Sequence, residues 1–263
     1  KPDTVLSDVG SVKQCALAAV LPQLEPSSRP SFVPAHPIAG SEKSGPKAAF
    51  AELFQNKKVI LTPHAEISPI AQKRITELWE SAGAVIEIMD AEEHDRIYAY
   101  VSHQVQFLAF CYALFLSQQK TTIAATPEFQ KFFRLAGSSP SMWSDILIYN
   151  QAMLLPVIQQ FSEELKNHMA GNESAASHYF QNLPGLIGKI LLKNLPESYV
   201  PYTGTGFKDF TSLAGNKEGI SPQVASAFLR HVEELQSIVR SHNYPALLEH
   251  LQQARHHYRR LAD

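Results

Sequence analysis

The residues best suited to chemistry are a histidine and the small-residue turn behind it. His36 follows the apolar run Phe32-Val33, and the segment from Pro37 to Gly45 is rich in glycine and serine. A neutral imidazole accepts a proton near pH 7, and a histidine at a strand end can meet a substrate. His36 is therefore a candidate general base. A loop histidine between two ordinary elements is the alternative interpretation of this turn alone.

A second polar segment, Asp8 to Lys13, follows the strand-like Thr4–Ser7 and opens a helix-like stretch. Together the two segments resemble the prephenate/arogenate dehydrogenases of tyrosine biosynthesis. In that family an Asp-x-Gly-Ser-Val-Lys strand end and a His-Pro-x-x-Gly-(Ser/Thr)-Glu-x-Ser-Gly turn lie side by side at the nicotinamide. The resemblance continues through Val59–Pro63, Met89–Asp95 and Val101–His103, and it extends to about residue 165.

The resemblance implies an oxidative decarboxylation of prephenate to 4-hydroxyphenylpyruvate, or of arogenate to tyrosine. Hydride leaves the carbinol carbon for NAD or NADP, the hydroxyl proton goes to a base, and the ring carboxylate departs as CO2. His36 fits the base, and Ser11 would hold the same hydroxyl or fix the imidazole tautomer. Ser11 has an alternative role as the N-cap of the following helix, a position that serine favours.

Several residues are candidates for substrate contact, because the substrate of this family carries two carboxylates. Arg134 is the best of them, since a planar guanidinium holds a carboxylate with two parallel hydrogen bonds. His103 lies in a predicted helix, either as a substrate contact or as a core histidine. Gln106 shares its face one turn on, where many relatives have a second histidine.

Further residues match the family turn and strand end. Ser41 and Glu42 follow the histidine and are expected at the substrate, with Glu42 orienting partners or gating access. Lys13 is a candidate cofactor contact, although a lysine on a helix is more often solvated. His94 and Asp95 are interpreted as structural, because acidic residues suit the positive N-terminal end of the long helix that follows.

Composition excludes several classes of function. The chain has 263 residues, a net charge of −2 and 44% hydrophobic residues, so neither a nucleic-acid surface nor an anionic-membrane surface is expected. The apolar run from Val105 to Leu116 is too short to span a bilayer. Cys15 and Cys111 lie in apolar contexts, which predicts a reducing, cytoplasmic location. No H-E-x-x-H or paired C-x-x-C occurs, so no metal site is expected.

The sequence predicts three regions. Residues 1–90 alternate strand and helix patterns, which indicates the C-terminal part of a Rossmann-like dinucleotide-binding α/β domain. No G-x-G-x-x-G follows a strand, so the chain is expected to be a fragment that lacks the N-terminal part of that domain. Residues 91–170 are predicted to form an all-α substrate and dimerisation unit, and residues 171–263 a second, degenerate copy of it.

Periodicity places the individual elements. Strands are predicted over Thr4–Val9, Ser31–Ala35, Lys58–Thr62 and Ala84–Met89. Helices are predicted over Val12–Leu21, Pro46–Phe54, Ser68–Ser81, Ala91–Ser117, Pro140–Met169, Pro222–Ser241 and Tyr244–Leu261.

The duplication rests on three segments that recur in the same order. The pairs are Ser102–Gln106 with Ser177–Gln181, Phe129–Gly137 with Phe207–Gly215, and Glu163–Leu165 with Glu233–Leu235. The family dimerises through its helical domain, so we expect a homodimer, or an intrachain pseudo-dimer of the two copies. A non-catalytic assembly or regulatory module, or an inactive fragment, is the alternative function. The presence of His36, Ser11 and Arg134 favours the enzyme.

Overall fold

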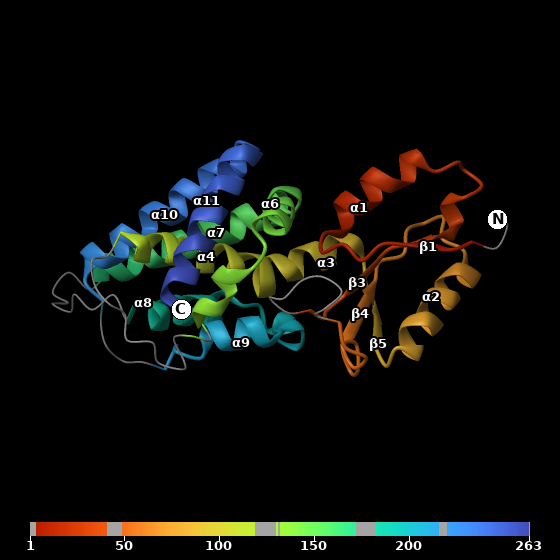
Figure 1. Cartoon of the computed structure of the whole chain (residues 1–263), viewed down its shortest axis with the longest axis horizontal. Coiled ribbons are helices and arrows are strands. Elements are labelled where there is room, and N and C mark those ends of the chain that lie inside the picture. The colour runs from red at the N-terminus through yellow and green to blue at the C-terminus, as the bar shows by residue number, and fades with distance from the viewer. Residues whose placement is uncertain are drawn as a thin grey trace. The chain divides into compact units, whose positions relative to one another are not determined.

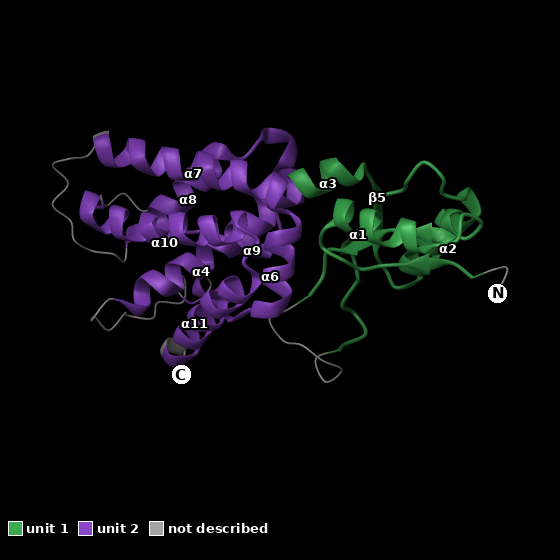
Figure 2. Cartoon of the chain, turned by 90° about the horizontal axis from the view of Figure 1, so that it is seen from above, with its two compact units in different colours: residues 1–96 green, residues 97–263 purple. Residues whose placement is uncertain are grey.

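The chain folds into two compact units, residues 1–96 and 97–263 (Figure 2). The computed structural model describes residues 4–40, 49–118, 130, 132–171, 182–215 and 220–262. The first unit is α/β and the second is helical, which confirms the predicted fold class of a Rossmann-like part followed by an all-α part. The internal duplication is not shown, and the division of the helical unit into two copies stays a prediction.

The first unit contains two small sheets (Figure 1). Strand β1 (Leu6–Ser7) pairs in parallel with β2 (Phe32–Val33). In the second sheet β4 (Lys58–Leu61) lies between β3 (Ala35–Pro37), which runs antiparallel to it, and β5 (Val85–Ile88), which runs parallel. The central strand is fully buried over Val59–Leu61, as its run of branched apolar residues predicts.

Helices flank these strands. Helix α1 (Lys13–Val20) follows β1, α2 (Pro69–Ser81) joins β4 to β5, and α3 (Ala91–Tyr98) begins after β5. Helix α2 packs Ala71 and Ile75 into the core of the sheet. Single turns of 3₁₀ helix, η1 (Leu21–Gln23) and η2 (Arg29–Ser31), lie between α1 and β2.

The described part of the second unit contains helices and no strand. They are a π-helical turn η4 (Ala99–His103), α4 (Gln104–Ser117), η5 (Arg134–Gly137), α6 (Pro140–Tyr149), α7 (Gln151–Gly171), α8 (Leu183–Asn194), η7 (Glu197–Tyr202), α9 (Thr205–Thr211), α10 (Pro222–Arg240) and α11 (Tyr244–Ala262).

Helix α4 forms the centre of this unit. Every residue from Gln104 to Leu116 is buried, and both α10 and α11 pack against the helix. The helical stretch Ala91–Ser117 is long and apolar enough to cross a membrane by length and composition, but 89% of its most apolar window is buried inside the protein. That burial is typical of a core helix.

Three element predictions need correction. Residues 51–56 form turns, so the predicted helix over Pro46–Phe54 is wrong in its described part. The strand predicted over Ser31–Ala35 is interrupted at Pro34, which has no N–H for a ladder, and His36 lies inside the next strand. The helix predicted over Pro140–Met169 is two helices that meet at Asn150.

Candidate active site

The backbone beside His36 is held by a partly buried ion pair. Lys13 Nζ lies 2.5 Å from Asp8 Oδ2 and donates to the carbonyl of Ala35 at 2.7 Å. The N–H of Ala35 donates to Asp8 Oδ1 at 3.2 Å. The lysine side chain has no solvent exposure. Both backbone groups of the residue before His36 are therefore bonded to the Asp8–Lys13 pair, which fixes strand β3 at this position.

The imidazole of His36 lies at the end of a chain of side-chain hydrogen bonds. His36 Nδ1 lies 2.8 Å from His94 Nε2, and His94 Nδ1 lies 2.8 Å from Asp95 Oδ1. The two imidazole rings meet edge to face, with centroids 5.0 Å apart. His94 and Asp95 are fully buried and His36 nearly so. The three side chains form a buried polar cluster in which each ring nitrogen of His94 has a partner.

The carboxylate at the far end of the cluster is bound to the start of α1. Asp95 accepts hydrogen bonds from the N–H groups of Lys13 at 2.7 Å and Gln14 at 2.9 Å. The first N–H groups of a helix lack partners within the helix and carry partial positive charge, so they stabilise an anion there. Asp95 thus caps a helix that lies far from it in sequence.

This arrangement corrects the alternative role of Ser11. The N-cap residue of α1 is Val12, whose side chain makes no capping bond, and Asp95 instead accepts from the N–H groups of Lys13 and Gln14. Ser11 does not cap α1. Its proposed contact with the substrate hydroxyl or the imidazole stays a prediction.

Burial governs the protonation of this cluster. Desolvation lowers the pKa of His94, and the hydrogen bond and charge of Asp95 oppose this shift. The charge of Lys13 lowers the pKa of His94 further, and that of Asp8 raises it. Desolvation also lowers the pKa of Lys13, against the stabilising charge of Asp8. His94 is therefore held neutral, as an acceptor for one neighbour and a donor to the other.

Among the described residues the helical unit contains a second polar group, around His103. His103 is the last residue of the π-helical turn and is buried. Its Nδ1 lies 2.7 Å from Asn150 Nδ2. The ring of Trp143 packs edge to face against the imidazole, with the ring centroids 6.1 Å apart. These contacts are those of a core histidine with bonded partners, and π-helical turns recur at functional sites. The substrate contact predicted for His103 stays a prediction.

Gln106 of α4 contacts the turn η5, which begins at Arg134. Gln106 Nε2 donates to the carbonyl of Leu135 at 2.7 Å, so the glutamine binds the residue next to Arg134. The guanidinium of Arg134 donates to Asp209 Oδ2 from Nε at 3.3 Å and from a terminal nitrogen at 2.9 Å. Both partners of this ion pair are partly exposed. Arg134 therefore has a carboxylate partner within the chain, and its binding of a substrate carboxylate stays a prediction.

The remaining predicted site residues fall into two groups. Ser41 and Glu42 lie outside the described residues. Lys13 is buried against Asp8 rather than solvated, and its cofactor contact stays a prediction. The sequence interpretation missed the bond between His94 and His36. The match of His94-Asp95 to the family motif could have indicated this bond. It was instead explained by the preference of a helix N-terminus for acidic residues.

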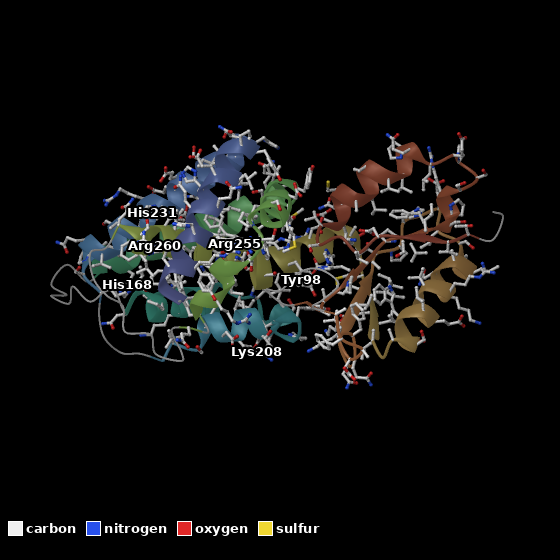
Figure 3. All side chains as sticks on the ribbon, in the orientation of Figure 1. Tyr98, His168, Lys208, His231, Arg255 and Arg260 are labelled. Atoms are coloured by element: carbon white, nitrogen blue, oxygen red, sulfur yellow. The ribbon has the colours of Figure 1, made fainter. Side chains whose placement is uncertain are left out.

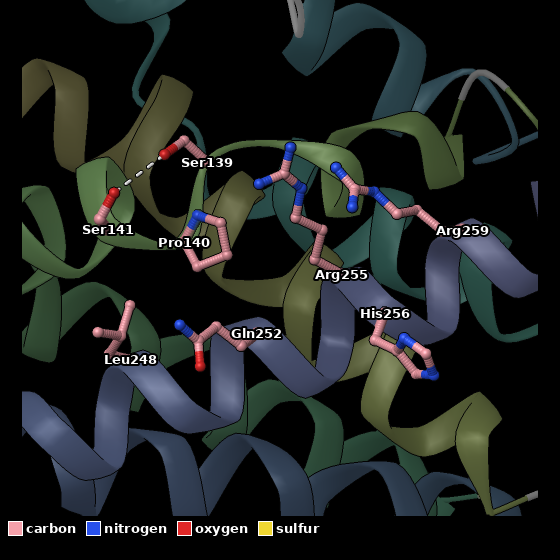
Figure 4. A pocket seen from close by; sticks show the side chains of 8 residues that line it. All are labelled: Ser139, Pro140, Ser141, Leu248, Gln252, Arg255, His256 and Arg259. Atoms are coloured by element: carbon pink, nitrogen blue, oxygen red, sulfur yellow. Dashed lines mark hydrogen bonds between the residues drawn. The ribbon is translucent and has the colours of Figure 1, made fainter.

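A cavity of about 340 Å³ lies in the helical unit between the start of α6 and helix α11 (Figure 4). Figure 4 shows the guanidinium groups of Arg255 and Arg259 side by side, with His256 nearby. Desolvation lowers the pKa of Arg255, and the charge of Arg259 lowers it further. None of the predicted site residues that the structure describes lines this cavity.

Comparison with known proteins agrees with the two-part fold. Residues 1–88 match the family model for the nucleotide-binding domain of prephenate dehydrogenase, and residues 90–183 match the model for its dimerization domain. A cyclohexadienyl dehydrogenase of Zymomonas mobilis is 37% identical over 172 residues, which cover 63% of this chain and 58% of that protein. A prephenate dehydrogenase of Bacillus subtilis is 33% identical over 62% of this chain and 45% of its own length.

A solved structure is also similar. The prephenate dehydrogenase of Aquifex aeolicus, in complex with hydroxyphenyl propionate and NAD+, aligns with a TM-score of 0.56 at 29% identity. The alignment covers 77% of this chain and 64% of that one. The chain thus spans between about half and two thirds of the length of these relatives. Two adjoining domain models of one family match most of its residues in order, so the chain belongs to the prephenate dehydrogenase family.

Proposed function

We propose that the protein containing this chain is a dehydrogenase that oxidatively decarboxylates prephenate or arogenate, with NAD or NADP as the hydride acceptor. The observation that carries the proposal is the buried His36–His94–Asp95 cluster within the match to the nucleotide-binding domain. The names of the relatives support the reaction class, since they include cyclohexadienyl and prephenate dehydrogenases. The products would be 4-hydroxyphenylpyruvate from prephenate and tyrosine from arogenate.

The task of His36 follows from the balance of the reaction. Prephenate loses a hydride from the carbinol carbon, and the bond to the ring carboxylate breaks so that its electron pair completes the aromatic ring. Hydride and CO2 leave without a net proton, so a base that takes the hydroxyl proton must return it to the phenolate oxygen. His36 is the candidate for this base, because the hydroxyl becomes more acidic as hydride departs and a neutral imidazole can accept its proton.

The turn after β1 is the part of this chain that fits the dinucleotide. Ligands of open α/β sheets bind beyond the carboxyl ends of the strands, and the exposed residues Val9 and Gly10 follow β1 there. A Cβ atom at Gly10 would lie 2.9 Å from Asp8 Oδ2, which is itself bonded to Lys13. The described residues contain no G-x-G-x-x-G turn, which is the motif that holds the pyrophosphate of a dinucleotide at a helix N-terminus. When bound, the dinucleotide would accept the hydride.

The direct test is an assay of the full gene product with prephenate and arogenate, each with NAD and with NADP. Reduction of the dinucleotide at 340 nm, with one CO2 released per hydride, is the expected result. No reduction in any of the four combinations would overturn the proposal. It would favour the non-catalytic assembly or regulatory role.

Assembly belongs to the same proposal. The match of residues 90–183 to a dimerization domain supports a homodimer. The packing of α10 and α11 onto α4 within one chain supports the intrachain pseudo-dimer instead. Light scattering separates them, because a chain of 29.2 kDa gives twice this mass only if it forms a homodimer. A cytoplasmic location is proposed with it, and among the described residues both cysteines are free thiols.

A further inference from the structure

We propose that His94 and Asp95 are positioning residues that hold His36 in the tautomer with its proton on Nδ1, so that Nε2 is the nitrogen that accepts the substrate proton. The assignment of His36 as the base rests on the proposed dehydrogenase function. The assignment of the tautomer rests only on the hydrogen bonds of the first unit.

The direction of the hydrogen bonds follows from their fixed end. Asp95 accepts two backbone N–H groups from α1, and a carboxylate has no hydrogen to donate. His94 must therefore donate from Nδ1 to Asp95, which leaves the lone pair of the neutral ring on Nε2. That lone pair lies 2.8 Å from His36 Nδ1, so His36 donates from Nδ1. Its second nitrogen, Nε2, then carries the lone pair.

The charges around His94 agree with this direction. Asp95 and Asp8 favour a positive charge on the imidazole, Lys13 disfavours it, and His36 is the second imidazole in contact. The complete burial of His94 disfavours its cationic form most strongly. A neutral His94 can accept one hydrogen bond and donate one, which is what the geometry requires.

The same chain of bonds stabilises His36 after it takes the proton. The imidazolium donates a stronger hydrogen bond to His94 Nε2, and the charge of Asp95 is one imidazole away. The proton stays on Nε2 until it returns to the phenolate oxygen, so no exit path to solvent is needed. His94 and Asp95 therefore lower the free energy of the protonated base without touching the substrate.

Two-bond ¹H–¹⁵N correlation spectra of the ¹⁵N-histidine-labelled protein test the tautomer directly. At pH 8 we expect His36 to carry its proton on Nδ1, with His36→Asn used to assign its signals. His64 provides an internal reference in the same unit, because its Nε2 lies 3.0 Å from the carbonyl of Phe32 and must hold the proton. A proton on Nε2 of His36 would overturn the proposal, whatever the protein catalyses.

Two substitutions of His94 separate positioning from folding. His94→Gln places an amide oxygen near Nε2, so His36 keeps an acceptor, whereas His94→Phe provides none. We expect kcat to fall at least tenfold further in the phenylalanine variant than in the glutamine variant. The acidic limb of the pH profile of kcat/KM should move down by about one pH unit in His94→Phe, because the protonated base loses its partner. Equal kcat values and unmoved limbs in two folded variants would contradict the proposal.

Asp95→Asn gives an independent check. The amide can donate to His94 Nδ1, which would reverse both bonds and place the proton of His36 on Nε2, where the base is blocked. We expect the spectra to show this reversed tautomer and kcat to fall by on the order of 10²- to 10⁴-fold. An active enzyme with the reversed tautomer in Asp95→Asn would refute the proposal, because a base that already holds its proton on Nε2 could not accept another there. If the wild type shows the expected tautomer but reduces no dinucleotide, the proposed function fails and the tautomer assignment stands.

Discussion

The chemistry proposed for the protein depends on a single side chain, His36, which lies in strand β3 and is nearly buried. Asparagine keeps a polar side chain of similar reach but accepts no proton at neutral pH. We expect His36→Asn to lower kcat by on the order of 10²- to 10⁴-fold, the usual contribution of a general base. Steady-state kinetics with the preferred substrate measures this. His64→Asn, in the same unit, is the matched control and should retain turnover within a few fold.

Arg134 offers a test of substrate binding with a control built into the chain. The guanidinium is paired with Asp209, so Arg134→Ala removes both a cation and an ion pair. We expect KM to rise at least tenfold in Arg134→Ala, because a carboxylate of the substrate loses its bidentate partner. Asp209→Ala removes the same ion pair and leaves the cation, so its KM should change much less. Equal increases in the two variants would assign Arg134 a structural role.

Asp95 joins helix α3 to the start of α1, and His94, which is bonded to Asp95, makes this contact sensitive to pH. Burial lowers the pKa of His94, so the folded state resists its protonation while the unfolded chain takes up a proton near its ordinary pKa of 6.5. The free energy of unfolding should therefore be highest above this pH and should fall as the pH drops below it, because the unfolded chain then binds a proton that the folded state does not. Urea unfolding from pH 7.5 to pH 5 measures this.

His94→Gln provides the control for the pH dependence, because its amide does not titrate. The pH dependence of unfolding should be smaller in this variant than in the wild type. Figure 3 labels His168 and His231, which lie in the helical unit and whose pKa values burial also lowers. Protonation of these two histidines should add the same pH dependence of unfolding to the wild type and to His94→Gln. An unchanged slope in His94→Gln would show that His94 does not contribute.

The residue that follows β4 has a buried side-chain hydroxyl. The Thr62 hydroxyl is buried and has no hydrogen-bond partner among the described residues. Because an unsatisfied buried hydroxyl costs about 1–3 kcal/mol, Thr62→Val should raise the free energy of unfolding by about 1 kcal/mol. Thr211→Val is the matched control, since the hydroxyl of Thr211 donates to the carbonyl of Phe207 at 2.9 Å and its loss should not stabilise.

Local patterns predicted the elements around the site well and its contacts poorly. The alternation of strands and helices before residue 90 and the periodic helices after it follow from spacing along the chain, and the structure contains them except for the helix predicted over Pro46–Phe54. The cap of α1 could not be found in this way, because its carboxylate comes from Asp95 and not from a neighbour such as Ser11. The pairing of Arg134 with Asp209 likewise joins segments that no local pattern connects.

At the scale of the whole molecule, the helical unit depends on residues beyond the matched dimerization domain. Leu251 of α11 is fully buried, and α11 packs against α4. We expect Leu251→Ala to lower the free energy of unfolding by about 2–5 kcal/mol, the cost of a large-to-small change in a core. Leu192 of α8 is about half exposed, so Leu192→Ala should cost far less. Denaturant unfolding of both variants measures the difference.

The stacking of Phe132 on Phe210 bears on the predicted duplication of the helical unit. Their ring centroids lie 3.9 Å apart, and the two residues occupy corresponding places in the predicted repeat. Contact between corresponding residues is what a local twofold arrangement of two copies would produce at its axis. The duplication itself stays a prediction.

The contact between Asp95 and α1 also sets the order in which the protein can mature. It joins positions 82 residues apart, and the bond between His36 and His94 spans 58. Contacts of such long range require closure of a large loop before they contribute energy, so they form late in folding. During synthesis His36 leaves the ribosome well before His94 exists. A nascent chain therefore contains His36 before His94 is present to fix the tautomer of its imidazole. We expect catalytic activity to arise only after the first unit has folded.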